Sequence, residues 1–132
     1  MSFSADGKTL ASGGNDAQSI VWDTASGSLR TVLSGHGVAV TAVAFSADGT
    51  SLATGGSDAE IKVWNLQSGH QRSTLSNGAD AAVAGLVFAR DGKALASIGG
   101  DARITLWDLN TNSVRGVFPG PDGTTNSVAF NP

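Results

Sequence analysis

Apolar and polar residues alternate in short runs along the whole chain, and turn-forming residues separate these runs. Runs of one kind place a leucine between small residues, and they comprise residues 9–12, 51–54 and 94–97. Runs of a second kind are rich in β-branched residues and end in tryptophan, and they comprise residues 19–22, 61–64 and 104–107. A period near two, broken by glycine or Asp-Gly at roughly every 8 to 12 residues, is typical of strands and disfavours helix. The pattern therefore predicts an all-β chain of short strands.

This strand pattern recurs with a nearly constant period. Tryptophan stands at Trp22, Trp64 and Trp107, with spacings of 42 and 43 residues. A phenylalanine precedes each tryptophan by 19 residues, at Phe3, Phe45 and Phe88, and Phe130 continues the series. An apolar residue follows each tryptophan by 11 residues, at Leu33, Leu75 and Phe118. Self-similarity at a fixed period of this length indicates a repeat architecture.

Each repeat is predicted to be a meander of four strands. The pairs Asp6-Gly7, Asp48-Gly49 and Asp91-Gly92 follow the leading phenylalanines, and glycine accepts the positive φ that tight turns require. The predicted units span about residues 1–34, 35–76 and 77–119, and residues 124–132 begin a further inner strand. A four-stranded sheet this small cannot bury both of its faces alone, so the units must stack as propeller blades do. We therefore expect one domain of three four-stranded antiparallel blades, which form an open arc or part of a larger ring.

At this point the chain resembles the WD-repeat β-propeller family along its whole length. The Trp-Asp dipeptide stands at Trp22-Asp23 and Trp107-Asp108, whereas the middle unit has Trp64-Asn65. A Gly-His dipeptide occurs once, as Gly35-His36, and the period matches the 40 to 45 residues of such repeats. The resemblance implies a non-catalytic scaffold that binds proteins or peptides.

The resemblance also implies a structural tetrad of hydrogen-bonded side chains in each blade. In the middle unit the matching residues are His36, Thr54, Asp58 and Trp64. The matching residues elsewhere are Ser12, Asp16 and Trp22 in the first unit, and Ser97, Asp101 and Trp107 in the third. The histidine of the first unit would precede Met1, and the third unit has Gly78 or Ala79 at that position. Such a network is expected to fix strand register more than it adds net stability.

Composition removes several other classes of function. The net charge is −3 and the basic residues are scattered singly, which disfavours nucleic-acid binding. The chain has no cysteine, and its two histidines suggest no metal site, so neither a thiolate nor a metal nor another cofactor is expected. His70 follows Gly69 in a turn and is interpreted as a solvated loop residue. No apolar run is long enough to span a membrane, and we expect a cytoplasmic protein with no catalytic residues.

The remaining candidate for function is one rim of the blades. Alternate loops of an up-and-down meander emerge on the same side, so the loops between blades share a rim with the loops that carry the tetrad aspartates. The predicted partner-binding rim comprises Asn15, Gln18, Val38, Ser57, Glu60, Asp80 and Arg103. Two alternatives stay open: a propeller enzyme or lectin-like small-molecule binder with its site over the central channel, and a purely structural fragment.

Three repeats are too few for a closed ring of about four to eight blades. Residues 125–130 repeat the inner-strand pattern whose end is seen at residues 1–3, so the two ends are complementary. We expect either a head-to-tail homo-oligomer or association with the remainder of a longer propeller chain. Two copies would form six blades and three copies would form nine.

Overall fold

The computed structural model describes residues 1–76, 80–121, 125 and 127–131, which form strands and contain no helix. The first sheet, blade one, consists of β1 (Ser2–Phe3), β2 (Thr9–Gly13), β3 (Gln18–Asp23) and β4 (Leu29–Ser34). Blade two consists of β5 (Val40–Phe45), β6 (Ser51–Gly56), β7 (Ile61–Asn65) and β8 (Gln71–Leu75). Blade three consists of β9 (Val83–Phe88), β10 (Ala94–Gly99), β11 (Ile104–Asp108) and β12 (Ser113–Phe118).

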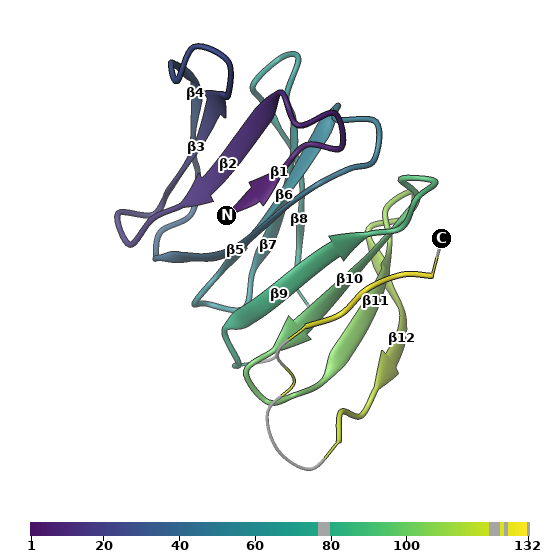
Figure 1. Cartoon of the computed structure of the whole chain (residues 1–132). Helices are drawn as coiled ribbons and strands as arrows, with labels where there is room; N and C mark the ends of the chain where they lie inside the picture. The colour runs from purple at the N-terminus through teal and green to yellow at the C-terminus, as the bar shows by residue number, and fades with distance from the viewer. Residues whose placement is uncertain (77–79, 122–124, 126, 132) are drawn as a thin grey trace.

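Every blade is an antiparallel meander in which each strand pairs with its neighbours in sequence. The three sheets stand side by side in an arc that does not close (Figure 1). The expected fold class, all-β with three four-stranded antiparallel blades in an open arc, is confirmed.

Short polar turns connect the inner two strands of each blade. In blade two the hydroxyl of Ser46 donates a hydrogen bond to Oδ1 of Asp48 at 2.6 Å, and it accepts one from the backbone N–H of Ser51 at 3.0 Å. Gly49 closes the turn with a φ of 70°, a conformation that glycine adopts without a steric penalty. Ser4 and Asp6 repeat the serine–aspartate contact in blade one.

The hydrophobic core lies between the blades. The face of blade one that carries Val21 and Leu33 packs against the face of blade two that carries Phe45 and Trp64. The opposite face of blade two packs in the same way against blade three, through Ile61, Val63 and Leu75 on one side and Phe88, Leu95 and Trp107 on the other. Blade two is thus the one blade with a neighbour on both faces, and stacking supplies the burial that a single sheet lacks.

Glycine allows the inner strands of adjacent blades to approach closely. A Cβ atom on Gly13 would lie 2.7 Å from Cγ1 of Val40, and one on Gly55 would lie 2.6 Å from Cβ of Val83. Both distances are shorter than carbon atoms tolerate. Ile98 occupies the equivalent place in blade three, and it is fully buried.

The two ends of the chain differ from the repeat. β1 contains only Ser2 and Phe3, which pair with Ala11 and Leu10 of β2. At the other end, residues 127–131 lie outside any strand, although an inner strand was predicted for residues 124–132. Positions 124, 126 and 132 of that prediction lie outside the described residues. A strand requires a hydrogen-bonding neighbour, and none of the described strands pairs with residues 127–131.

Candidate functional site

Three of the predicted tetrad residues meet in the interior of blade two. Trp64 on β7 donates a hydrogen bond from its indole N–H to Oγ1 of Thr54 at 2.9 Å. Nε2 of His36, which lies between β4 and β5, is 2.8 Å from the same Thr54 oxygen. The Thr54 side chain is fully buried on β6, so this hydroxyl links the inter-blade loop to two strands.

The surroundings of His36 favour its neutral form. Burial is the main cause that lowers the pKa of His36 below its ordinary value of 6.5, and the ammonium of Lys62 adds to this effect. The Asp58 and Glu60 carboxylates act in the opposite direction. A neutral imidazole carries one N–H. The contact between Nε2 and the Thr54 hydroxyl is a hydrogen bond in either tautomer: His36 donates when the proton is on Nε2, and Thr54 donates when it is on Nδ1. The Thr54 hydroxyl also lies 3.5 Å from the carbonyl oxygen of Lys62.

Asp58, the fourth predicted member, has a different partner. Its Oδ1 accepts a hydrogen bond from the backbone N–H of Glu60 at 3.2 Å, within the turn between β6 and β7, and its side chain is exposed. Nδ1 of His36 is buried and has no hydrogen-bond partner among the described residues. Among the described residues, no hydrogen bond therefore joins His36 to Asp58.

Blades one and three repeat the tryptophan–hydroxyl contact without a described histidine. Trp22 donates to Oγ of Ser12 at 3.1 Å, and Trp107 donates to Oγ of Ser97 at 2.9 Å. Asp16 and Asp101 hold their turns as Asp58 does, through the backbone N–H groups of residues 18 and 103. Gly78 and Ala79, the predicted counterparts of His36, lie outside the described residues. A set of contacts found at the same place in each blade is architectural, whereas catalysis needs one asymmetric constellation.

Backbone hydrogen bonds tie the predicted rim loops together. The N–H of Val40 donates to the carbonyl of Gly14 at 2.9 Å, and the N–H of Ser57 donates to the carbonyl of Ala39 at 3.0 Å. Between blades two and three, the N–H of Gly100 donates to the carbonyl of Ala82 at 2.8 Å. Each inter-blade loop therefore lies against a loop that carries a tetrad aspartate, and these loops form one continuous rim.

The seven predicted rim residues differ in how far they are exposed. The exposed ones are Asn15, Ser57, Asp80 and Arg103, and the half-buried ones are Gln18, Val38 and Glu60. Two of them form ion pairs within the chain, Arg103 with Asp101 at 3.7 Å and Glu60 with Lys62 at 3.2 Å. Neither of these ion pairs includes Asn15, Ser57 or Asp80, so these three exposed residues present their polar groups at the rim.

Sequence reasoning missed one repeated feature of the rim. Ala17, Ala59 and Ala102 adopt positive φ values of 66°, 66° and 64° directly after the turn aspartates. This left-handed conformation costs an alanine roughly 1 kcal/mol or more relative to glycine. Alanine itself carries no signal for such a conformation. Its recurrence after Asp16, Asp58 and Asp101 is visible in the sequence only once the repeats are aligned.

Two hollows lie between the blades. One of about 360 Å³ lies between blades two and three and is lined by Ser97, Trp107, Asp101 and Arg103 among others. The second, of about 540 Å³, lies between blades one and two near Arg30, Thr50 and Ser68. Within the described part of the chain, no three histidine or acidic side chains are grouped to hold a metal ion. No described helix is long and apolar enough to cross a membrane.

Comparison with known proteins identifies the repeat. The family model of the WD40 repeat (WD domain, G-beta repeat) matches residues 1–23 and 27–65, which cover blade one and most of blade two. No curated protein matches the chain. Blade three has the same strand order and the same tryptophan–hydroxyl contact as the two matched blades. Residues 1–65 are therefore WD40 repeats, and blade three repeats their strand order and their tryptophan–hydroxyl contact, as in a WD-repeat propeller.

Proposed function

We propose that this chain is a non-catalytic scaffold that binds a protein or peptide through the rim formed by its inter-blade and tetrad loops. WD40 repeats generally mediate protein–protein interactions and are typically non-catalytic. The observation that carries the proposal for this chain is the backbone bonding of the rim loops. The bonds at Val40, Ser57 and Gly100 hold exposed loop residues on a rigid surface without regular secondary structure of its own. Rigid elements that present loops are the usual architecture of a binding site.

Contacts of the inner strands also favour binding over catalysis. Thr41 is the one polar side chain of β5, and its hydroxyl bonds to the carbonyl oxygens of Gly55 and Val83, at 3.1 and 2.6 Å. That hydroxyl is thus engaged in joining blades two and three. His36 and Asp58, which resemble two members of a charge relay in sequence, make no bond to each other through Nδ1. These observations support the scaffold over an enzyme or small-molecule binder at the channel.

The same proposal includes the assembly in which the scaffold acts. Three blades that do not close leave one face of blade one and one face of blade three without a neighbouring blade. We place the chain within a larger propeller, completed by further copies or by the remainder of a longer chain.

Arginine substitution at the rim tests the binding role. The variant N15R/S57R adds two cations to exposed rim positions, and the control A5R/A47R adds two cations to the turns after β1 and β5. Capture from native extract, quantified by mass spectrometry, is expected to yield at least one protein that the wild type and the control retain and the rim variant loses. That protein, once purified, should bind the wild type in calorimetry. Equal capture by all three chains, or no specific capture, contradicts the rim proposal and favours a purely structural role.

A further inference from the structure

The exposure of equivalent residues shows which surfaces of the arc lack a neighbour. Leu33 and Leu75 lie in the last two positions of the outer strands of blades one and two, and they are 2% and 1% exposed because the next blade covers them. Phe118 holds the same place in blade three and is 52% exposed. We call the surface of blade three formed by Ile104, Leu106 and Phe118 the C-face. These residues match Ile61, Val63 and Leu75, which blade three covers.

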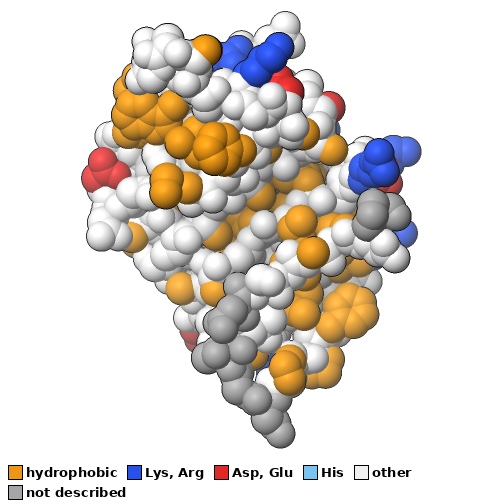
Figure 2. All heavy atoms as spheres, in the orientation of Figure 1, with side chains coloured by type: hydrophobic (Ala, Val, Ile, Leu, Met, Phe, Trp, Pro, Cys, Tyr) orange, Lys and Arg blue, Asp and Glu red, His pale blue; other side chains and the backbone are white. Residues whose placement is uncertain are grey.

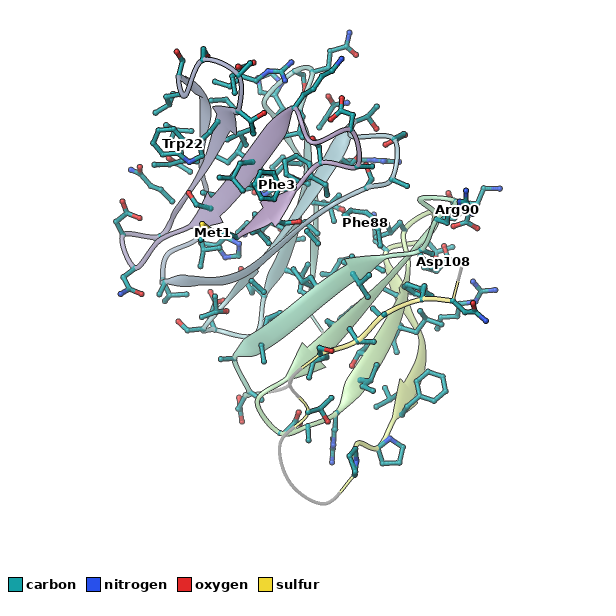
Figure 3. The ribbon with its side chains drawn as sticks, viewed as in Figure 1. Met1, Phe3, Trp22, Phe88, Arg90 and Asp108 are labelled. Carbon is teal, nitrogen blue, oxygen red and sulfur yellow. The ribbon has the colours of Figure 1, made fainter. Side chains whose placement is uncertain are left out.

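The first blade has the complementary unpaired surface. Phe45 and Phe88 are 9% and 8% exposed because the preceding blade covers them, whereas Phe3 is 62% exposed. Phe3 pairs with Leu10, and Leu10 pairs with Trp22, so these side chains share one face of the sheet. We call the surface formed by Phe3, Leu10 and Trp22 the N-face. In Figure 3, Met1, Phe3 and Trp22 lie together on blade one.

We propose that a second copy of this chain covers both faces at once, with the C-face of each copy packed against the N-face of the other. The proposal rests on membership of a larger propeller and names its partner. Inside the chain, each of the two blade–blade interfaces packs a surface equivalent to the C-face against a surface equivalent to the N-face. A second copy therefore presents to each open face a surface with the same strand order and apolar pattern as its normal neighbour.

The placement of the two faces favours two copies. In Figure 2 apolar side chains are visible over blade one and over blade three on the side that faces the viewer, with others between them. Open faces on the same side of the arc can both be covered by one partner turned through a half rotation. Two arcs of three blades then close as a six-bladed ring, within the range of about four to eight blades that propellers adopt. Such a closed association leaves no open face for further growth.

The strand edges give an independent argument for a copy of this chain. β1 pairs with Leu10 and Ala11 only, which leaves the inner edge of β2 open at Ser12 and Gly13. Residues 127–130 read Ser-Val-Ala-Phe, close to the Ala-Val-Ala-Phe of β5, and they lie in no strand within this chain. In the dimer Ser127 and Val128 of one copy pair with this two-residue edge in the other by strand addition, because Ser2 and Phe3 already occupy the edge at Ala11 and Leu10. Ile98, on the inner strand β10 of blade three, is already buried within its own chain and offers the partner no surface. The partner therefore contacts the C-face through the outer strands β11 and β12.

Two single variants test this arrangement. In F118D every C-face carries a buried carboxylate on assembly, and in F3D every N-face does. Both side chains are exposed within one chain, so the substitutions spare the fold of the monomer. V114D is the matched control, because Val114 is 41% exposed on β12 but pairs with Trp107, on the opposite face of the blade. Light scattering after size exclusion should give twice 13.2 kDa for the wild type and V114D, and 13.2 kDa for F118D and F3D.

Mixing the two variants gives the decisive result. A mixed dimer of F118D and F3D retains one interface in which neither face is altered, whereas either variant alone retains none. We expect the equimolar mixture to recover a dimer fraction that neither variant shows. A folded wild-type monomer of 13.2 kDa, a dimeric F3D or F118D chain, or a mixture that stays monomeric overturns the proposal. Because no rim ligand enters this measurement, its failure leaves the result of the rim capture experiment unaffected.

Discussion

The hydroxyl of Thr54 accepts the indole N–H of Trp64 at 2.9 Å and lies 2.8 Å from Nε2 of His36, in a place with no access to water. In blade one the equivalent hydroxyl, Ser12, serves Trp22 alone, at 3.1 Å and in a partly exposed setting. The two hydroxyls thus occupy the same repeat position but satisfy different numbers of buried groups.

Removal of these hydroxyls should therefore have unequal effects. Thr54→Val keeps the shape of the side chain and leaves the Trp64 and His36 nitrogens unpaired, at a cost of about 1–3 kcal/mol for each buried group. We expect T54V to lower the free energy of unfolding by about 2–4 kcal/mol and S12A by about 1 kcal/mol or less. Urea titration followed by tryptophan fluorescence measures both, at one fixed protein concentration. Equal losses in the two variants would show that His36 contributes nothing through Thr54.

The pKa of His36 predicts a dependence of stability on pH. Burial lowers the pKa of this imidazole in the folded chain below 6.5, so the unfolded chain binds a proton first as the pH falls. The unfolded state then binds more protons than the folded state, and stability is fully present above pH 6.5 and declines below it. We expect H36Q to flatten the decline between about pH 7 and pH 5, the range of histidine titration.

Acid titration of Asp48, in the turn between β5 and β6, falls in a separate range. The hydroxyl of Ser46 is the main group that lowers the pKa of Asp48 below its ordinary 3.8, so the contribution of this carboxylate is lost only as the pH falls through the region below that value. S46A serves as the control for H36Q, because it should change stability below about pH 4 and leave the slope near pH 6 intact. An unchanged slope near pH 6 in H36Q would mean that another group titrates there.

Much of the fold could be predicted from the sequence, because repetition samples each position three times. Trp22, Trp64 and Trp107 all donate to the hydroxyl that stands ten residues earlier, as their common register requires. The role of Asp58 was harder to predict. The carboxylate of Asp58 accepts a hydrogen bond from the backbone N–H of Glu60, two residues later, and this bond closes a local turn. Such a bond within the turn competes with a bond from Asp58 to His36.

Other features were invisible before the structure because they depend on neighbours. Phe3 has the same residue type and spacing as its buried counterparts Phe45 and Phe88, and Phe118 is apolar like its buried counterparts Leu33 and Leu75. Only the absence of an adjacent sheet in the chain exposes Phe3 and Phe118. The segment 127–130 has the pattern of an inner strand, yet a pattern cannot supply the second strand that pairing needs.

Strain at the rim predicts a stabilising substitution. Ala17 has a φ of 66° and is only half-buried, so its Cβ opposes the conformation without much compensating burial. We expect A17G to raise the free energy of unfolding by about 0.5–1 kcal/mol. Ala47, exposed in a turn and not among the residues of positive φ, is the control. A47G should lower stability, because glycine there only adds freedom to the unfolded chain. A loss of stability in A17G by thermal or urea unfolding would contradict the assignment of strain.

Close approach of the inner strands predicts that Gly55 cannot be enlarged. A methyl group at Gly55 would lie 2.6 Å from Cβ of Val83, on the neighbouring β9, so the two blades must move apart to admit it. Overpacking of this kind costs about 1–3 kcal/mol. Gly37 has open space around its Cβ position, so G37A should change stability by less than about 0.5 kcal/mol. Removing the opposing methyls in the double variant G55A/V83A should recover part of the loss, and a double-mutant cycle from urea titrations measures that coupling. Additive effects of G55A and V83A would show that the blades do not meet at these two residues.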